Sequence, residues 1–168
     1  MKSQIRTVPY RRRRENKTDY KKRLALLKSN KHRFVIRKSL KHLIVQIIDY
    51  KADGDKVLLT VSSSELKKLG WKHSTSNIPA AYLVGLLCGK KAQNLKIKNG
   101  VLDLGVNISI KGSRLYAALK GLIDSGISIP VNEEVFPDEE RLSGKHIEKF
   151  RKIELEKDFN QIKNKILE

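Results

Sequence analysis

A run of cations near the start of the chain is the feature best suited to chemistry with a charged partner. Arg11, Arg12, Arg13 and Arg14 stand in a row, and Lys17 follows closely. A guanidinium is always charged, forks onto two phosphate oxygens and stacks on bases. Tyr10 and Tyr20 flank the run, so an unpaired base could stack beside it. These residue types predict a phosphate clamp, which carries no sequence code of its own.

The excess positive charge is local to the first quarter of the chain. Residues 1–42 contain 16 lysines and arginines against two acidic residues, a net charge of +14. Residues 43–168 contain 20 basic and 16 acidic residues, a net charge of only +4. A segment so poor in acids repels itself unless an anion neutralises it. The charge pattern therefore predicts a polyanionic partner, with nucleic acid as the default.

The basic surface continues beyond the arginine run into the next predicted elements. Counting these positions, the candidate RNA-binding residues are Arg11, Arg12, Arg13, Arg14, Lys17, Tyr20, Lys21, Arg23, Lys31, Arg33, Arg37 and Lys38. For Tyr20, ordinary packing is an equally good interpretation. A non-specific protein that coats nucleic acid or an anionic membrane would carry a similar charge run, and we keep it as an alternative.

A second kind of chemistry is suggested by acids at the ends of predicted elements. Asp49, Asp103 and Asp124 would serve a metal-dependent RNase if they converged, because such enzymes hold metal ions between carboxylates. Acids at these positions more often cap turns or helices. The four histidines lack the paired spacing of a zinc site, and no phosphate-cradling glycine loop or nucleophile elbow is present. We therefore expect no enzyme activity, metal or cofactor, and keep the RNase as an alternative.

The elements that must hold the basic residues begin with a short helix over 20–29, capped by Thr18 or Asp19. The alternation in 33–39 predicts a strand whose outward face forms a stiff platform for phosphates. That face is expected to carry Arg33, Val35, Arg37 and Ser39.

The rest of the pattern predicts an α/β fold. The apolar run 43–50 reads as a central strand, and a turn at 52–55 leads to a third strand over 56–61, which completes an antiparallel three-strand meander. Strands then alternate with helices, which indicates a mixed sheet flanked by helices. The predicted later strands are 95–98 and 101–106, and the predicted helices are 65–69, 78 to about 89, 115–126 and the tail from 143.

We expect three parts in the chain. Residues 1–18 form a basic RNA-binding arm, which alone in water should be disordered because it cannot bury enough apolar surface. Residues 19–142 form the globular α/β domain, and residues 143–168 form a C-terminal helical extension. The single cysteine, Cys88, excludes a disulfide within the chain. With no apolar run near 20 residues and no secretory signal, the sequence predicts a cytosolic protein.

Several motifs, in order, resemble the archaeal and eukaryotic branch of the large-subunit ribosomal protein family "L eighteen", called "L five" in eukaryotes. They are 11–20 (RRRRENKTDY), 70–72 (GWK), 77–82 (NIPAAY), 115–121 (LYAALKG), 136–137 (FP) and 141–147 (RLSGKHI). The resemblance covers roughly residues 5–150, and the length of the tail suggests the archaeal form.

The resemblance implies a structural constituent of the large ribosomal subunit that binds 5S rRNA and anchors it to the large-subunit rRNA in the central protuberance. It implies a ribonuclease-H-like arrangement without nuclease activity. The expected partners are 5S rRNA, large-subunit rRNA and neighbouring ribosomal proteins, including the one called "L five" in bacterial naming. By motif matching, the RNA-contacting role falls on Arg11 to Arg14, Lys17, Tyr20, Arg23, Arg33, Arg37 and Lys38.

Overall fold

A computed structural model describes residues 8–168, so the part of the predicted arm before Val8 lies outside the described residues. The strands are β1 (Arg33–Lys38), β2 (Leu43–Asp49), β3 (Lys56–Ser62) and β4 (Val101–Asp103). The helices are α1 (Arg11–Arg14), α2 (Tyr20–Leu27), α3 (Glu65–Lys68), α4 (Ile78–Asn94), α5 (Arg114–Asp124), the 3-10 turn η1 (Glu133–Val135), α6 (Glu139–Ser143), α7 (Lys145–Arg151) and α8 (Leu155–Leu167).

The four strands form one mixed sheet in the order β3-β2-β1-β4. β1 pairs antiparallel with β2, and β2 pairs antiparallel with β3, which confirms the predicted meander. β4 runs parallel to β1, with Val35 opposite Asp103. The α/β class with a mixed sheet is therefore confirmed.

Two predicted strands differ from the structure because the backbone turns early. The strand predicted over 101–106 ends at Asp103. There the Asp103 side chain accepts a hydrogen bond from the Gly105 amide, and Gly105 adopts a φ of +58°. The stretch 95–98 is not a strand; Lys96 takes a φ of +59° just beyond α4. One isolated bridge, between Asn99 and Ser128, replaces the expected edge pairing.

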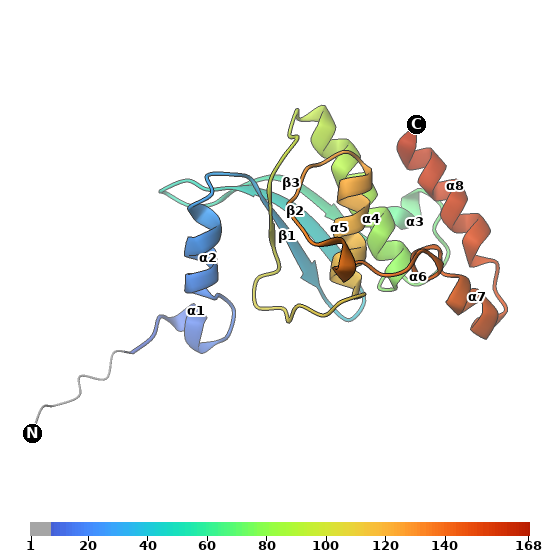
Figure 1. The fold of residues 1–168 in the computed structure, drawn as a ribbon, viewed down its shortest axis with the longest axis horizontal. Helices are drawn as coiled ribbons and strands as arrows, with labels where there is room; N and C mark the ends of the chain where they lie inside the picture. The colour runs from blue at the N-terminus through green and yellow to red at the C-terminus, as the bar shows by residue number, and fades with distance from the viewer. Residues whose placement is uncertain (1–7) are drawn as a thin grey trace, which may run out of the picture.

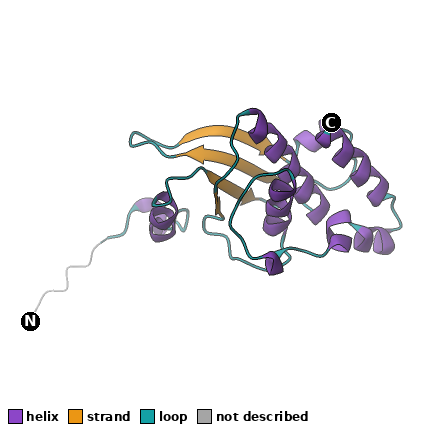
Figure 2. Ribbon diagram, turned by 45° about the horizontal axis from the view of Figure 1, so that its top comes forward, coloured by secondary structure: helices purple, strands orange, loops and turns teal. Residues whose placement is uncertain are grey.

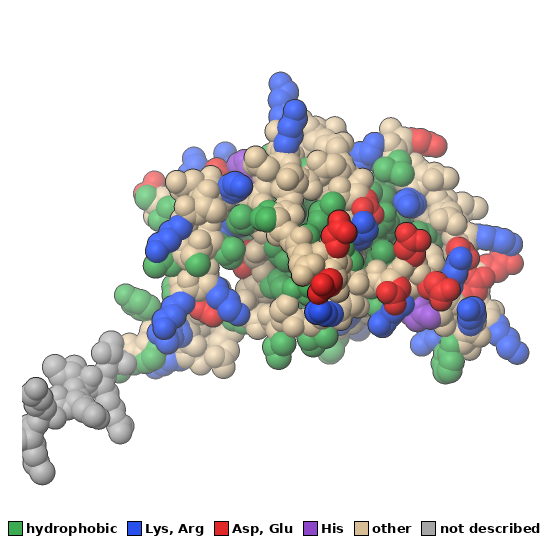
Figure 3. Space-filling model, in the orientation of Figure 1, with side chains coloured by type: hydrophobic (Ala, Val, Ile, Leu, Met, Phe, Trp, Pro, Cys, Tyr) green, Lys and Arg blue, Asp and Glu red, His purple; other side chains and the backbone are tan. Residues whose placement is uncertain are grey.

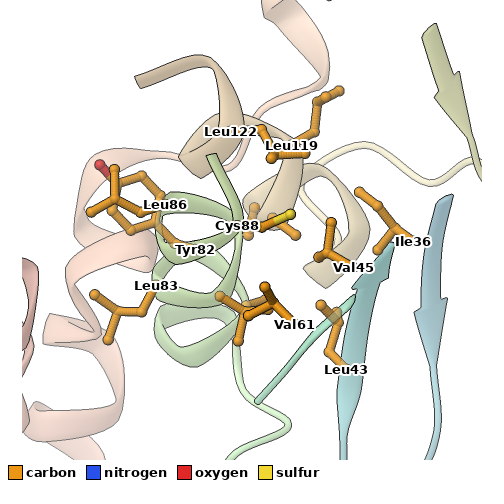
Figure 4. Packing of buried hydrophobic residues seen from close by; sticks show 14 of the residues in the cluster. Ile36, Leu43, Val45, Val61, Tyr82, Leu83, Leu86, Cys88, Leu119 and Leu122 are labelled. Atoms are coloured by element: carbon orange, nitrogen blue, oxygen red, sulfur yellow. The ribbon is translucent and has the colours of Figure 1, made fainter. Parts of the chain in front are cut away.

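One face of the sheet is covered by α4 and α5, and the core lies between these layers (Figure 1). Figure 4 shows side chains of the strands pointing toward those of the two helices. The strand residues are Ile36, Leu43, Val45 and Val61, and the helix residues are Leu83, Leu86, Cys88, Leu119 and Leu122. All of them are buried, so burial of apolar surface holds this face together.

Small residues let α4 and α5 approach each other closely. A Cβ at Gly121 would overlap the backbone of Tyr82 and Leu86, and a Cβ at Gly89 would overlap the Ser125 side chain. Gly89 therefore lies inside α4 as a contact with its neighbour. This explains why the helix continues to Asn94 instead of ending near Gly89.

The predicted helical tail is present and packs on the far side of α4 (Figure 1). Leu155, Phe159, Ile162 and Ile166 of α8 are buried in the same hydrophobic cluster as the sheet. The Phe159 ring lies 5.6 Å from the Tyr82 ring, centroid to centroid. The C-terminal helices thus share the core of the α/β layers.

Candidate nucleic-acid interface

The arginine run forms a single helical turn, which the sequence did not predict. Tyr10 precedes α1, and its carbonyl accepts hydrogen bonds from the amides of Arg13 and Arg14. Asn16, with a φ of +50°, then reverses the chain, and the Arg12 Nε donates to the Thr18 hydroxyl at 2.9 Å. None of the α1 residues is buried, so the four guanidinium groups face solvent.

The tyrosines that flank the run pack against each other. The Tyr10 and Tyr20 rings lie 5.6 Å apart between centroids, tilted by 58°, yet 77% of Tyr10 and 38% of Tyr20 stays exposed. The two rings therefore pack against each other, and each keeps surface that is accessible to solvent. Stacking of either ring on a base stays a prediction.

The second basic helix, α2, begins where the sequence predicts it. Asp19 is the N-cap, and its carboxylate accepts the amides of Lys21 and Lys22. No residue of α2 is buried. In Figures 1 and 2 the helix stands apart from the α4 and α5 layer. It lies beside one end of the sheet, on the side of the molecule where the N-terminus lies.

The face of the sheet opposite α4 and α5 carries a row of polar side chains. Arg37 on β1 donates through Nε to Gln46 on β2 at 3.1 Å, and Gln46 donates to the Thr60 hydroxyl on β3 at 3.1 Å. Arg37 is exposed, and within the described residues its terminal nitrogens make no hydrogen bond or ion pair. The row forms the flat, polar part of the predicted platform.

A cleft lies between this sheet face and the basic segment of α1 and α2. Five of the candidate residues line it, together with Lys22: Arg12, Lys17, Arg23, Arg33 and Arg37. Asp19, Asp55 and Asp103 also line it. A hollow beside it is lined by Arg13, Tyr20 and Lys21. The cations from two helices and one strand therefore converge, as expected for contact with phosphates.

Arg33 is not on the exposed surface where the sequence placed it. Its side chain is 4% exposed, and its terminal nitrogens pair with Asp55 at 2.5 Å and with Asp103 at 3.0 Å. The expectation failed because α2 and the loop after β4 cover this end of the outer face, so that Val35 and Ile48 there are also buried. A buried guanidinium requires such paired carboxylates.

Four other candidate residues do not line the cleft. They are Arg11, Arg14, Lys31 and Lys38, all of them exposed. Sequence reasoning missed Gln46 and Thr60 on the outer face and Asp55 beneath the cleft. The alternation of β2 places Gln46 opposite the apolar positions, which could have revealed it. Asp55 pairs with Arg33, 22 positions earlier in the chain, and with Arg23, 32 positions earlier. No local sequence pattern indicates contacts over such separations.

The three carboxylates of the nuclease alternative do not meet. Asp103 is bound by Arg33, whereas Asp124 accepts the Tyr82 hydroxyl at 2.9 Å and pairs with Lys120. Asp49 lies 3.7 Å from the His32 ring nitrogen. Over residues 8–168, no group of three or more His, Cys, Asp or Glu side chains is arranged to hold a metal ion.

The acidic residues are unevenly distributed along the molecule. Figure 3 shows mainly Lys and Arg among the charged atoms over the α1 and α2 region, whereas Asp and Glu atoms gather toward the C-terminal helices, where Lys and Arg atoms lie among them. Within the described chain, no helix has the length and apolar character needed to cross a bilayer.

Known proteins resemble this chain over most of its length. The sequence model of a family described as "Ribosomal large subunit proteins 60S L5, and 50S L18" matches residues 5–100. The large ribosomal subunit protein uL18 of Korarchaeum cryptofilum is 51% identical over 143 residues, which are 85% of this chain and 73% of that protein. The uL18 protein of Methanothrix thermoacetophila is 46% identical over 160 residues, 95% of each chain. The chain belongs to the uL18 family.

Membership of the uL18 family makes this chain a structural constituent of the large subunit of the cytoplasmic ribosome, and not an enzyme. Its partners are rRNA and other ribosomal proteins. The metal-dependent RNase is therefore ruled out by the family. The matched residues 5–100 include α1, α2 and the three-strand meander, so they contain the cleft residues that come from these elements.

Proposed function

We propose that this uL18-family protein binds 5S rRNA with its basic arm and outer sheet face, and anchors it to the large-subunit rRNA. The convergence of α1, α2 and β1 cations around one cleft carries the proposal. A basic surface built from helices and a sheet suits the backbone of a folded RNA, because phosphate contacts need charge and shape.

The proposed phosphate contacts are the exposed candidate cations, some of which line the cleft or the hollow beside it. They are Arg11, Arg12, Arg13, Arg14, Lys17, Lys21, Lys31, Arg37 and Lys38. Tyr20 adds a partly exposed ring on which a base could stack. Arg23 and Arg33 are assigned a different role, because both pair with Asp55.

Specificity for 5S rRNA would come from the shape of the RNA and its unpaired bases. The major groove of A-form RNA is too narrow for side chains to read, and phosphate contacts carry no sequence information. The rigid sheet face and the cleft present the cations in one arrangement, which only an RNA of matching shape can contact at once.

Competition binding tests the proposal. Labelled 5S rRNA is bound to the full chain at physiological salt and displaced with unlabelled 5S rRNA or bulk tRNA. We expect 5S rRNA to compete at least about 10³-fold better, which is the lower end of the usual range of specificity ratios. Equal competition by tRNA would instead support the non-specific coating protein.

Deletion of residues 1–18 tests the arm. The deletion keeps the α2 cap Asp19 and removes no buried residue among those described, so we expect the fold to be retained. Most of the 5S rRNA affinity should be lost. Unfolding of the truncated chain, seen by circular dichroism, would show that the arm belongs to the core.

A further inference from the structure

We infer that Asp55 is a positioning residue for RNA binding: its carboxylate latches the basic helix α2 to the sheet, so that the cations of the cleft are preset for the RNA. The inference rests on the proposed function. It starts from an acid that lies within a surface suited to a polyanion.

Helix α2 has no fully buried residue to anchor it. Leu24 is 58% exposed, and the neighbouring Leu26 and Leu27 are only half-buried. Between residues 8–30 and the rest of the described chain, the one hydrogen bond or ion pair joins the Arg23 Nη2 to the Asp55 Oδ1 at 2.8 Å. This contact is the polar restraint on where the arm and α2 lie.

Asp55 is itself held from below by the buried Arg33. The other carboxylate oxygen of Asp55 accepts the Arg33 Nη2 at 2.5 Å, and Arg33 is fixed in turn by Asp103 at 3.0 Å. Asp103 accepts the Gly105 amide with its second oxygen. The chain Arg23–Asp55–Arg33–Asp103 therefore connects α2, the β2–β3 turn, β1 and β4.

The Asp55 carboxylate is charged under ordinary conditions. Burial alone would raise its pKa, but the hydrogen bonds and positive charges of Arg33 and Arg23 outweigh burial and hold the pKa below its usual 3.8. Charge-assisted hydrogen bonds of this kind are shorter and stronger than neutral ones, so a single latch can orient a helix.

Pre-organisation of α2 raises the affinity for RNA, because the arm and α2 need not be ordered during binding. If the latch is lost and α2 occupies its binding position only part of the time, the apparent dissociation constant rises by the reciprocal of that fraction. The phosphates contacted in the final complex stay the same, and so does the salt dependence.

Positioning and simple electrostatics predict opposite results for removal of this acid. If Asp55 only adds negative charge near the RNA, Asp55→Asn should tighten binding. If Asp55 is a latch, the same substitution should weaken binding. Asp53 provides a matched control, because it lies in the same turn, is exposed and makes no ion pair among the described residues.

The experiment compares wild type, Asp55→Asn and Asp53→Asn for binding to 5S rRNA over a range of salt concentrations. We expect Asp55→Asn to bind about tenfold more weakly, with an unchanged salt slope. Asp53→Asn should bind as wild type or slightly more tightly. Equal affinity of the two variants would overturn the latch while leaving 5S rRNA binding intact. If wild type shows no preference for 5S rRNA, it is the proposed function that fails.

Amide hydrogen exchange in the free protein keeps the test decisive if Asp55→Asn is poorly folded. Arg23→Gln breaks the latch but leaves the Asp55–Arg33 pair in place. We expect faster exchange over Tyr20–Leu27 in Arg23→Gln and wild-type protection in β2. Unchanged exchange in α2 would contradict the latch, because it would mean that other contacts hold the helix.

Discussion

Single charged side chains tie distant parts of the core together. Glu65, at the start of α3, accepts the Ser62 amide at 2.9 Å and pairs with Lys91 of α4 at 2.7 Å. Burial would raise the Glu65 pKa, but the Lys91 ammonium and the Ser62 amide outweigh burial and lower it from its usual 4.5. The pair links the end of β3 to the long helix.

Glu65→Gln should therefore lower the free energy of unfolding at neutral pH by about 0.5–1 kcal/mol, as for a partly exposed ion pair. A carboxylate with a lowered pKa stabilises the fold above its unfolded pKa, and loses this effect as pH falls through its folded pKa. Urea unfolding at pH 7 and pH 3 should show the difference between wild type and variant closing in acid. An equal difference at both pH values would contradict the ion pair, and Glu139→Gln is an exposed control.

Cys88 should be chemically inert in the folded protein. The pKa of its thiol is raised to about 12, mainly because the side chain is buried between the two layers. Almost no thiolate therefore forms at neutral pH. We expect no alkylation by iodoacetamide at pH 8 in native buffer and rapid alkylation in denaturant. Fast reaction of the native chain would show that the α4 packing is open.

The packing of α4 on α5 is the contact between elements that the fold depends on most directly. Gly→Ala inside a helix usually stabilises it by about 0.5–1 kcal/mol. At Gly121 the added Cβ would overlap the Tyr82 and Leu86 backbone, so the two helices would have to separate. We expect Gly121→Ala to destabilise the protein by about 2–3 kcal/mol in urea unfolding. A stabilised variant would contradict the close approach.

The elements themselves were largely predictable because their signals are local. Periodicity identified the meander, α4 and α8. The structure adds the cap of α4, where the Asn77 side chain accepts the Ala80 amide at 2.9 Å. The continuation of α4 past Gly89 and the end of β4 at Asp103 were not predictable, because packing against α5 and the turn at Gly105 decide them.

The candidate site was predictable only where its signal in the sequence is local. The cation density of the arm is a local signal, so the basic face could be anticipated from the sequence alone. The burial of Arg33 could not, because it depends on Asp55 and Asp103, which join it only after the sheet forms. Sequence reasoning identified where positive charge is abundant, and the structure separates the exposed cations from those that hold the cleft.

The molecule as a whole has a basic end and a core end. The described part of the arm and α2 lie at one end of the sheet, while α4, α5 and α8 form the apolar core on the sheet's other side from the polar face (Figure 1). In the proposed complex, the core would hold the sheet rigid while the charged end contacts rRNA. Binding should therefore depend on salt far more strongly than folding does.

The salt dependence of 5S rRNA binding by the full chain is the measurement that addresses this division most directly. With about 6–10 phosphates contacted, the affinity should fall by roughly 10³–10⁵ between 50 and 200 mM monovalent salt. Truncation of the arm should flatten the slope in proportion to the cations removed. A wild-type affinity that hardly changes over this range would contradict recognition of RNA through the basic face.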